Sequence, residues 1–513
     1  LTVTGSCSVC VNSSNSPFQV LSGSIVPLNS TLDFLVGAQA STSAKFAVLN
    51  VNSGTPTASV SAGTAGAAYL TASGTLQTTA KQHLTLGGDT TGNITLTPNG
   101  GTDGFVTVNG TLAAKTSGPA TIVVAASDTS AKGKLQADYV GDGTDDDVTI
   151  EAAIAALPAG GGTVALLEGT YSIGDSAGDG IDFTKSNVTL TGAGRNTILQ
   201  RQGDTASNDG VITVGDGGTT QVTGIIISNL AVDGQKATYA GVENNGIYIA
   251  RDLYQSKILN NWIYNNDGDG IQVEATANPV NYLVIHGNDI RNNDEDGIDI
   301  RNAANYNTIS HNSIVSSLDD GITLVTSNNN DIVDNTIVSA GGEAVFITSA
   351  STRNTVSNNV IDSPTGDGIL INGSSKTSIT GNNIYNSSNG INLASSSPNN
   401  TVTGNTVSTT SAVGINLDTG SANNTVSGNS IEATGTSGIE LGTSTNNNTI
   451  SSNTAYGVQF IGSSNNTISQ NELNDNGFNG VYLQDNSNSN IIFNNTAKRN
   501  YATYNPGTIA GGY

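Results

Sequence analysis

The most regular pattern along this chain is a small residue followed by an apolar–x–apolar triplet. In Gly297-Ile298-Asp299-Ile300, Ile298 and Ile300 would face one side of a strand and Asp299 the other. This alternation is typical of a strand that buries one face. The copies of the motif begin at Gly246, Gly270, Gly297, Gly321, Ala344, Gly368, Gly390, Gly414, Gly438, Gly457 and Gly480. Successive copies are therefore 19 to 27 residues apart.

Two further markers recur with the same period. The first is Asn-x-apolar, at Asn261, Asn288, Asn312, Asn335, Asn359, Asn382, Asn405, Asn429, Asn453, Asn471 and Asn495. The second is Asn-Thr-Ile or a close variant, at Asn307, Asn354, Asn400, Asn424, Asn448 and Asn466. Three strand-like pieces in each repeat of roughly 23 residues predict a solenoid, in which each repeat forms one coil.

Aligning the repeats produces two apolar columns. The first column reads Ile271, Ile298, Ile322, Val345, Ile369, Ile391, Ile415, Ile439, Val458 and Val481. The second reads Val273, Ile300, Leu324, Ile347, Ile371, Leu393, Leu417, Leu441, Phe460 and Leu483. If the coils stack, each buried Ile or Leu contributes about 1.5–3 kcal/mol, and no repeat can bury its face alone. We interpret the Asn columns as architectural, because Asn suits tight turns and stacked amides can hydrogen-bond along a column.

Residues 1–137 differ from the repeats in composition. They are rich in Ser, Thr, Ala and Gly and contain short alternating runs at 46–51, 93–97 and 104–108. We predict a β-rich N-terminal segment that serves assembly or attachment. At the other end, residues 501–513 break the repeat, and we expect them to form a C-terminal cap or tail, since terminal repeats are atypical.

The sequence that follows the N-terminal segment, starting at Asp138, contains a helix pattern. We predict a capping helix at about 146–157, with Asp145 or Asp146 as its N-cap. One face of the helix is apolar, and it consists of Ile150, Ala153, Ile154 and Leu157. Pro158 and the glycines at 160–162 would end it. Such a helix would cover the first coil and protect its open edge.

These segments carry a family resemblance. The sequence DGTDD, the stretch AAIAALPAGGGTVALLEGTY and residues 189–199 resemble the start of pectin-lyase-like right-handed parallel β-helices. The later Asn-x-Ile repeats resemble NosD-type repeats, so the resemblance covers about residues 138–500. It implies an all-β protein with a right-handed, three-sheet parallel β-helix, and often a polysaccharide ligand. That superfamily includes lyases, hydrolases, alginate epimerases, phage tailspikes and non-catalytic surface proteins, so the fold does not decide the function. The N-terminal runs resemble segments of bacterial surface proteins.

Charge and composition narrow the partners and the compartment. The chain has 17 basic and 41 acidic residues, a net charge of −24, which argues against nucleic acid and anionic membranes and permits divalent cations. No apolar run reaches the roughly 18–20 residues of a transmembrane helix. Because the chain has no Met, we expect a processed or truncated start, preferably a removed export signal, and an extracellular or cell-surface location. Cys7 and Cys10 would form a local disulfide, or one of them a cross-link to another subunit.

The residue before each repeat glycine forms an acidic column. Its members are Asp269, Asp296, Asp320, Glu343 and Asp367, after which the position becomes Asn389, Val413 and Ser437. Carboxylates on adjacent coils, roughly 4.8 Å apart, would repel by about 0.9 kcal/mol in water and about 3.5 kcal/mol at an effective dielectric of 20. Raised pKa values, an intervening Arg or Lys, or bound Ca²⁺ would relieve this. The five acids are therefore candidate Ca²⁺ ligands, although no cofactor is required; the alternative is that Asp-Gly is ordinary turn chemistry.

The same region contains candidate catalytic residues. Asp296 and Asp299 in one coil, followed by Asp319 and Asp320 in the next, resemble the carboxylates of polygalacturonase-type hydrolases. That resemblance implies one acid that protonates the leaving oxygen and another that activates water. The next coil has Gly341-Gly342-Glu343 where that family has Gly-His-Gly, and no Arg-x-Lys follows. For a lyase, Arg291 and Arg301 are the candidate bases, with pairing to nearby acids as their alternative role. His311 is a further candidate acid or base, but its position at the start of a repeat strand favours a structural role, and the Asp-Pro-His motif of an alginate epimerase is absent.

Three functions remain open from the sequence. The preferred one is a non-catalytic, exported structural or adhesive protein, such as a filament or surface-layer subunit that self-associates head to tail. The first alternative is a polysaccharide lyase or hydrolase that uses Asp296, Asp299, Asp319, Asp320 and Arg301. The second is a glycan binder similar to a phage tailspike. A single Trp and 5% aromatic residues give little support for a sugar groove.

Overall fold

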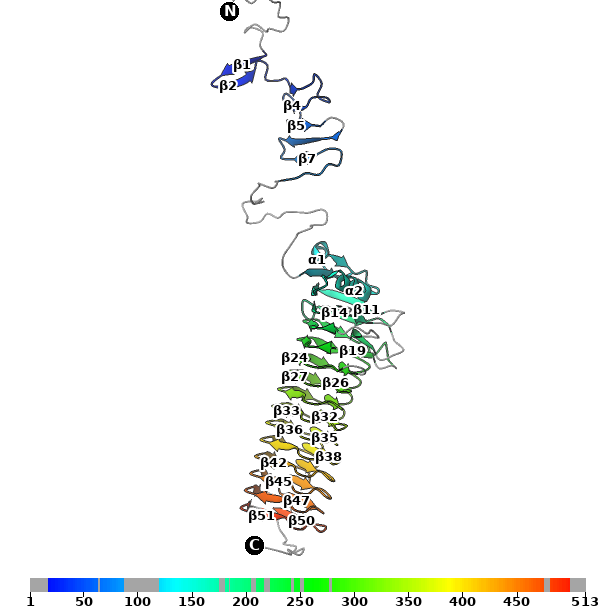
Figure 1. Cartoon of the computed structure of the whole chain (residues 1–513), viewed down its shortest axis with the longest axis vertical. Helices are drawn as coiled ribbons and strands as arrows, with labels where there is room; N and C mark the ends of the chain where they lie inside the picture. Colours follow the sequence, from blue (N-terminus) through cyan, green and yellow to red (C-terminus); the bar gives the residue numbers. More distant parts are fainter. Residues whose placement is uncertain are drawn as a thin grey trace, which may run out of the picture. The chain divides into compact units, whose positions relative to one another are not determined.

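The computed structural model describes residues 17–62, 65–86, 120–174, 180–183, 185–203, 209–215, 222–240, 244–249, 253–275, 279–474 and 480–498. The chain divides into two compact units, Leu1–Lys115 and Thr116–Tyr513 (Figure 1). Cys7, Cys10, the runs at 93–97 and 104–108, and the expected cap at 501–513 all lie outside the described residues.

The described strands of the N-terminal unit form two antiparallel sheets. A hairpin of β1 (Phe18–Leu21) and β2 (Ser24–Pro27) precedes a five-stranded sheet. The sheet runs in the order β3 (Phe34–Val36), β4 (Phe46–Leu49), β5 (Thr57–Ser61), β6 (Ala67–Thr71) and β7 (Leu76–Thr78). Among its described residues only Ala44 and Ala47 are buried apolar side chains. The described part of this unit therefore has little core, as the small side chains of the segment predict.

The second unit is a parallel solenoid built from three long sheets, and each coil contributes one strand to each sheet in turn. Sheet 1 contains β9 (Tyr139–Val140), β8 (Thr121–Ala125), β10 (Gly162–Leu166), β13 (Val188–Thr191), β17 (Ile226–Ser228), β21 (Lys257–Leu259), β24 (Val284–His286), β27 (Thr308–Ser310), β30 (Asp331–Val333), β33 (Thr355–Ser357), β36 (Ser378–Thr380), β39 (Thr401–Thr403), β42 (Thr425–Ser427), β45 (Thr449–Ser451), β48 (Thr467–Ser469) and β51 (Ile491–Phe493). Sheet 2 contains β11 (Gly169–Ile173), β14 (Thr197–Arg201), β18 (Ala231–Asp233), β22 (Trp262–Tyr264), β25 (Asp289–Arg291), β28 (Ser313–Val315), β31 (Thr336–Val338), β34 (Val360–Asp362), β37 (Asn383–Tyr385), β40 (Thr406–Ser408), β43 (Ser430–Glu432), β46 (Thr454–Ala455), β49 (Glu472–Asn474) and β52 (Thr496–Lys498).

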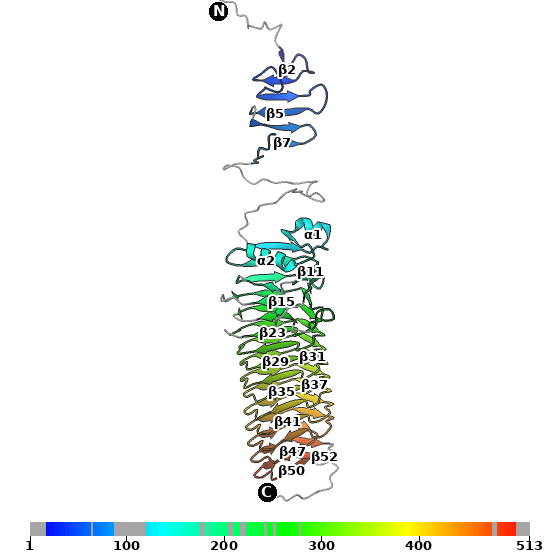
Figure 2. The ribbon, with the colours of Figure 1, turned by 90° about the vertical axis from the view of Figure 1, so that its right-hand side faces the viewer.

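Sheet 3 closes each coil. It contains β12 (Ile181–Asp182), β15 (Asp209–Val214), β19 (Asn244–Ile249), β23 (Ile271–Glu274), β26 (Ile298–Arg301), β29 (Ile322–Val325), β32 (Val345–Thr348), β35 (Ile369–Asn372), β38 (Ile391–Ala394), β41 (Ile415–Leu417), β44 (Ile439–Leu441), β47 (Val458–Ile461) and β50 (Val481–Gln484). A short parallel pair, β16 (Val222–Thr223) with β20 (Leu253–Tyr254), forms a separate two-stranded sheet. Figure 2 shows the strands of successive coils stacked along the solenoid axis.

The register in sheet 3 confirms the two apolar columns. Ile271 pairs with Ile298 and Ile298 with Ile322, and the same pairing continues to Val458 and Val481. The side chains of both columns are buried in one continuous core, except that Val481 and Leu483 in the last coil are only partly buried. Stacking of like residues in register therefore produces the dry interior that the repeat pattern predicts.

The Asn-x-apolar marker forms a ladder from Asn261 to Asn495, which is buried as far as Asn471. Asn335 illustrates it: its backbone N–H and its Nδ2 both donate to Oδ1 of Asn359, at 2.9 and 3.0 Å. Its Nδ2 also donates to the carbonyl of Ile309, at 2.9 Å. Each amide thus links three successive coils and satisfies backbone groups that the corner leaves unpaired. The architectural interpretation of this column is confirmed.

The first coil is covered by helix α2 (Asp146–Ala156), whose Ile150, Ala153 and Ile154 are buried. The predicted cap was wrong in detail. Asp145 has a left-handed backbone and its side chain makes no capping hydrogen bond. Instead, the Asp146 carboxylate accepts from the backbone N–H groups of Gly143 and Ser172, at 3.2 and 2.9 Å, so it ties the helix to sheet 2.

The solenoid unit starts earlier than Asp138, where the sequence analysis placed its first residue. Strand β8 (Thr121–Ala125) pairs with β10 inside sheet 1 and is followed by a short helix, α1 (Ala131–Gln136), which the pattern did not predict. Within the described residues, no helix is both long enough and apolar enough to cross a bilayer.

Candidate functional site

The acidic column lies in the turn that leads from sheet 2 into sheet 3. Glycine follows four of the five acids, and Ala344 follows Glu343. The space at this position is tight: a Cβ on Gly297 would lie 2.5 Å from Cγ2 of Ile314 and 2.6 Å from the carbonyl oxygen of Gly321. The backbone of one coil therefore approaches the next coil closely. The acid that precedes the glycine lies against the same turn of the following coil.

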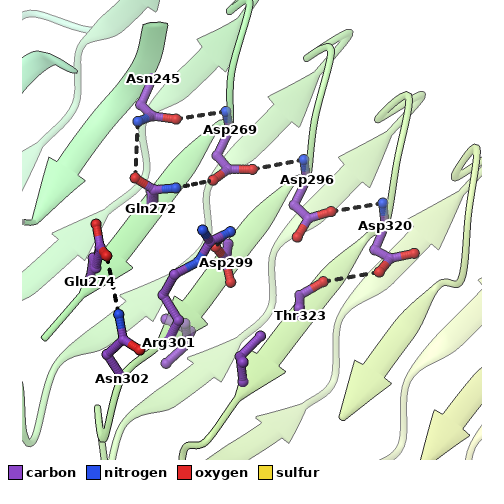
Figure 3. A network of polar contacts seen from close by, with 12 residues as sticks. Asn245, Asp269, Gln272, Glu274, Asp296, Asp299, Arg301, Asn302, Asp320 and Thr323 are labelled. Atoms are coloured by element: carbon purple, nitrogen blue, oxygen red, sulfur yellow. Dashed lines mark hydrogen bonds and ion pairs between the residues drawn. The ribbon is translucent and has the colours of Figure 1, made fainter. Parts of the chain in front are cut away.

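The acids form a carboxylate ladder along three coils (Figure 3). The backbone N–H of Asp296 donates to Oδ1 of Asp269 at 2.8 Å, and that of Asp320 donates to Oδ1 of Asp296 at 2.8 Å. The N–H of Glu343 donates to Oδ1 of Asp320 at 2.6 Å. Asp269, Asp296 and Asp320 are buried, and Glu343 is half-buried. Carboxylates here accept the same kind of backbone bond that amides accept in the Asn ladder.

The second carboxylate oxygens are held by the outer face of sheet 3. Oδ2 of Asp269 accepts from Nε2 of Gln272 at 2.9 Å, and Oδ2 of Asp320 accepts from Oγ1 of Thr323 at 3.2 Å. Asn245 extends the network, because its Oδ1 accepts from the N–H of Asp269 at 2.7 Å and its Nδ2 donates to Gln272 at 3.2 Å. The sequence analysis missed these three polar residues. Gln272 and Thr323 occupy the middle position of the apolar–x–apolar triplet, so the alternation alone could have identified them.

Asp299 and Arg301 form an ion pair on the same outer face. The Asp299 side chain is completely buried, whereas that of Arg301 remains 33% exposed. Burial raises the pKa of Asp299 to about 6, although the adjacent Arg301 opposes that rise. Burial in turn would lower the pKa of Arg301, but the Asp299 carboxylate outweighs it and holds that pKa above its usual value. Arg301 therefore stays cationic beside the acid ladder.

The ladder acids themselves favour the protonated form. Burial, and next the neighbouring carboxylate of Asp299, raises the pKa of Asp296 to about 7. Burial and the charge of Asp296 raise the pKa of Asp320 to about 9. Burial also raises the pKa of Asp269 well above its ordinary range, with Asp299 as the next cause. Near neutral pH this corner therefore holds protons, or would exchange them for a cation.

Three carboxylates converge at the centre of this region. One oxygen from each of Asp296, Asp319 and Asp320 lies within 4.8 Å of the others, and Asp319 is exposed. We call these three residues the acid cluster. It is the one grouping of at least three potential metal ligands in the described part of the chain.

The acid cluster only partly matches the predicted residues. Two of the five candidate Ca²⁺ ligands join it, together with Asp319 from the catalytic candidates, while Asp269, Glu343 and Asp367 lie outside it. Asp367 instead accepts from Nδ2 of both Asn389 and Asn392, each at 2.8 Å. Ca²⁺ binding along the column stays a prediction.

Two other candidates lie elsewhere on the coils. Arg291 is on sheet 2, where its Nε donates to Oδ1 of Asp289 at 2.5 Å. His311 sits at the corner between sheets 1 and 2, with its ring 4.9 Å from that of His286. Neither residue belongs to the acid cluster, so Arg301 is the cation that the structure places beside the predicted acids.

Two family models match the solenoid sequence. The right handed beta helix region matches residues 320–458 and 367–511. The family described as periplasmic copper-binding protein (NosD) matches residues 173–365. These ranges together contain the apolar columns, the Asn ladder and the acid cluster.

Individual proteins resemble parts of the chain. Alginate lyase 7 of Azotobacter vinelandii is 42% identical over 124 residues, which cover 21% of this chain and 13% of that protein. Mannuronan C5-epimerase AlgE1 of the same organism is 37% identical over 136 residues, which cover 25% of this chain and 9% of the epimerase. Among solved structures, the Dettilon tailspike protein has a TM-score of 0.46 and 16% identity, covering 66% of this chain and 65% of the tailspike. This chain therefore spans only a small fraction of the curated relatives that it matches. The family matches and the three-sheet coil together show that this chain has a right-handed parallel β-helix fold.

Proposed function

We propose that this β-helix protein cleaves glycosidic bonds of a polysaccharide at the acid cluster. The observation that carries the proposal is the convergence of three carboxylates from two successive coils, one of them exposed. The raised pKa values of Asp296 and Asp320 add support, because they keep proton donors in place near neutral pH. The similarity to alginate lyase 7 and to a mannuronan epimerase supports a polysaccharide as the ligand.

Each residue then has a defined role in hydrolysis. Asp320, with a pKa of about 9, donates its proton to the glycosidic oxygen as the bond from that oxygen to the anomeric carbon breaks. Asp319 is exposed and accepts a proton from the water that adds to the anomeric carbon. Arg301 is partly exposed and cationic, so it can pair with an acidic substituent of the sugar. The products are one new reducing end and one new hydroxyl group.

Activity assays on purified protein test this directly. Polyuronates and neutral glucans are incubated with wild type, Asp319→Asn and Asp320→Asn, with and without Ca²⁺. We expect reducing ends without the ultraviolet absorbance of an unsaturated sugar, which a lyase would produce. Each variant should be about 10²–10⁴-fold slower than wild type. The control Asp331→Asn, which changes an exposed Asp on sheet 1 outside the cluster, should keep the wild-type rate. Unchanged turnover in Asp296→Ala/Asp320→Ala would reject the site.

Self-association in a structural or adhesive role is the second candidate. It is favoured by exposed apolar side chains in the N-terminal unit, where Val20 and Ile25 are each 76% exposed. The last coil likewise exposes Ile491 on β51, the edge strand of sheet 1. Exposed strand edges and apolar side chains favour pairing with another chain. Light scattering at high concentration tests this role: assembly that Val20→Asp/Ile25→Asp abolishes would support it, and a strictly monomeric wild type would contradict it.

We also propose that the protein works outside the cytoplasm, in an extracellular or periplasmic compartment. The support is the match to a family described as periplasmic and the similarity to an alginate lyase. Fractionation of expressing cells would test it, and recovery of the native protein only in the cytoplasm would reject it.

A further inference from the structure

The corner that leads from sheet 3 into sheet 1 has an unusual composition over five coils. From Tyr282 to Asn465, the residue two positions before each strand of sheet 1 has a left-handed backbone, with φ between 56° and 61°. In successive coils these residues are Tyr282, Tyr306, Asn329, Arg353 and Lys376, followed by Asn399, Asn423, Asn447 and Asn465. Asn is therefore the ordinary residue of this corner, and four of the first five coils depart from it.

The departures are energetically unfavourable for the backbone. Asn tolerates the left-handed region, whereas side chains such as Tyr, Arg and Lys adopt it only at a cost. A residue held in this conformation against its preference often serves a function. The fold does not require these residues, because Asn supplies the same corner in the later coils. Their side chains therefore need an explanation outside the coil.

The tyrosines form an exposed stack. The rings of Tyr282 and Tyr306 lie parallel within 17°, with centroids 5.5 Å apart, and Tyr254 packs edge-on against Tyr282 at 5.1 Å. Tyr282 and Tyr306 remain 46% and 50% exposed. Aromatic rings in the core of a protein contribute through burial, but these two rings face solvent.

Two cations continue the same line. Arg353 and Lys376 are exposed, and Nε of Arg353 donates to Oδ1 of Asn329 at 3.0 Å. Neither forms an ion pair with any carboxylate of the described residues. Acidic residues outnumber basic ones 41 to 17 in this chain, so two adjacent cations without acidic partners are conspicuous and favour an anionic ligand.

We propose that Tyr254, Tyr282, Tyr306, Arg353 and Lys376, here called the tyrosine–basic strip, bind one chain of an acidic polysaccharide along the solenoid axis. The tyrosine rings would pack against the C–H faces of sugar rings, and Arg353 and Lys376 would pair with sugar carboxylates. Coils repeat at roughly 4.8 Å, so Tyr282 to Lys376 spans about 19 Å, which accommodates several sugar units. The strip is at a different corner from the acid cluster, and its binding does not depend on the cluster being catalytic.

The corner itself supplies the test variants. Tyr282→Asn/Tyr306→Asn and Arg353→Asn/Lys376→Asn restore the residue that the later coils use, so both should fold with an unchanged or higher Tm. Binding of a polygalacturonate oligomer and of a neutral dextran is measured by calorimetry at low and high salt. The measurements are made in the Asp320→Asn background, which prevents turnover without touching the strip. Tyr385→Ala on sheet 2 and Lys132→Gln on α1 are matched controls.

We expect polygalacturonate to bind wild type more tightly than dextran, and binding to weaken with salt because salt screens exposed charges. Each double variant should bind about tenfold more weakly, the basic one with a smaller salt dependence, and the controls should bind normally. Absence of polygalacturonate binding to wild type, or binding to both double variants as tight as binding to wild type, would overturn the proposal. Loss of self-association in the variants, seen by light scattering without a change in sugar binding, would show instead a protein-binding surface and also overturn it. Loss of turnover in Asp320→Asn with polygalacturonate binding intact would support the catalytic role of the acid cluster and would agree with binding at the separate strip.

Discussion

The coils from Gly297 to Gly368 and those from Gly390 to Gly438 share one scaffold but differ at the turn from sheet 2 into sheet 3. Both sets carry the same buried apolar columns and the same Asn ladder. Before the repeat glycine, however, the first set has acids, whereas the second has Asn389, Val413 and Ser437. The scaffold therefore tolerates several side chains at that turn. The residue at this position can then be selected for its chemistry, since the fold does not dictate it.

The hydrogen bonds make this comparison sharper. Oδ1 of Asn389 accepts from the backbone N–H of Val413 at 3.1 Å, as Oδ1 of Asp296 accepts from that of Asp320 at 2.8 Å. A neutral amide thus satisfies the turn without bringing a charge into the low-dielectric corner. Successive buried carboxylates raise each other's pKa values and are more than the turn requires, which is the argument for a functional role.

The largest expected effect should be the same in both sets of coils, because it concerns the shared scaffold. Asn335→Ala in the acidic coils and Asn405→Ala in the later ones each remove two amide donors and one acceptor that join three coils. We expect each to lower the free energy of unfolding by about 2–4 kcal/mol, since buried backbone groups lose their partners. Urea denaturation measures it. An effect in only one set would show that the two scaffolds are not equivalent.

The pH dependence of stability should separate the two sets. The folded pKa values of Asp296 and Asp320, about 7 and about 9, exceed the unfolded value of about 3.9, so the folded state binds more protons between these limits. Their contribution is complete below pH of about 4 and is lost as pH rises through 7 to 9. We expect the Tm of wild type to fall over that range, and the Tm of Asp296→Asn/Asp320→Asn to fall less. Parallel pH curves would contradict the raised pKa values.

Calcium should act on the acidic coils alone if it binds there. A divalent cation bound at the acid cluster would displace the protons of Asp296 and Asp320, so its effect should be larger at pH 8 than at pH 5. At saturating Ca²⁺, about 100 times Kd, we expect roughly 2.7 kcal/mol of added stability, measured as a rise in Tm that Asp319→Asn/Asp320→Asn abolishes. An equal rise in that variant would place the ion elsewhere.

Much of the scaffold could be predicted because its residues repeat. The columns headed by Ile271 and Val273 and the ladder that starts at Asn261 follow from the period alone, and the register of sheet 3 confirms the columns. Helix α2 could be predicted from its apolar face, but its cap could not, because the Asp146 carboxylate bonds to Ser172 in another element. Strand β8 was missed because it precedes the repeats and belongs to the solenoid only through its pairing with β10.

The candidate site was less accessible to sequence reasoning. The acid column was visible as a repeat position, yet only the structure shows that Asp319 approaches Asp296 and Asp320 while Asp367 turns to Asn392. Burial of Asp299 also could not be predicted, since the alternation assigns it to the outer face of sheet 3. The tyrosine–basic strip was missed because Tyr282, Tyr306, Arg353 and Lys376 share a backbone conformation and not a residue type.

The smallest expected effect comes from extending the acids by one coil into the second set. Nδ2 of Asn389 donates to Oδ1 of Asp367 at 2.8 Å, and Asn389→Asp replaces this donor by a second carboxylate at the same distance. Two carboxylates would then face each other. Because Asn389 is only half-buried, we expect a loss of about 1 kcal/mol, as for like charges about 4 Å apart in water. Adding Asp367→Asn to this variant leaves one amide facing one carboxylate again, so the loss should disappear. Urea denaturation of the single and the double variant measures the difference, with Asn416→Asp, one coil farther on, as the control that adds a charge away from Asp367. If Asn389→Asp is equally destabilising with and without Asp367→Asn, the amide is needed for its shape, and the acids of the earlier coils would then reflect local packing in place of a selected charge.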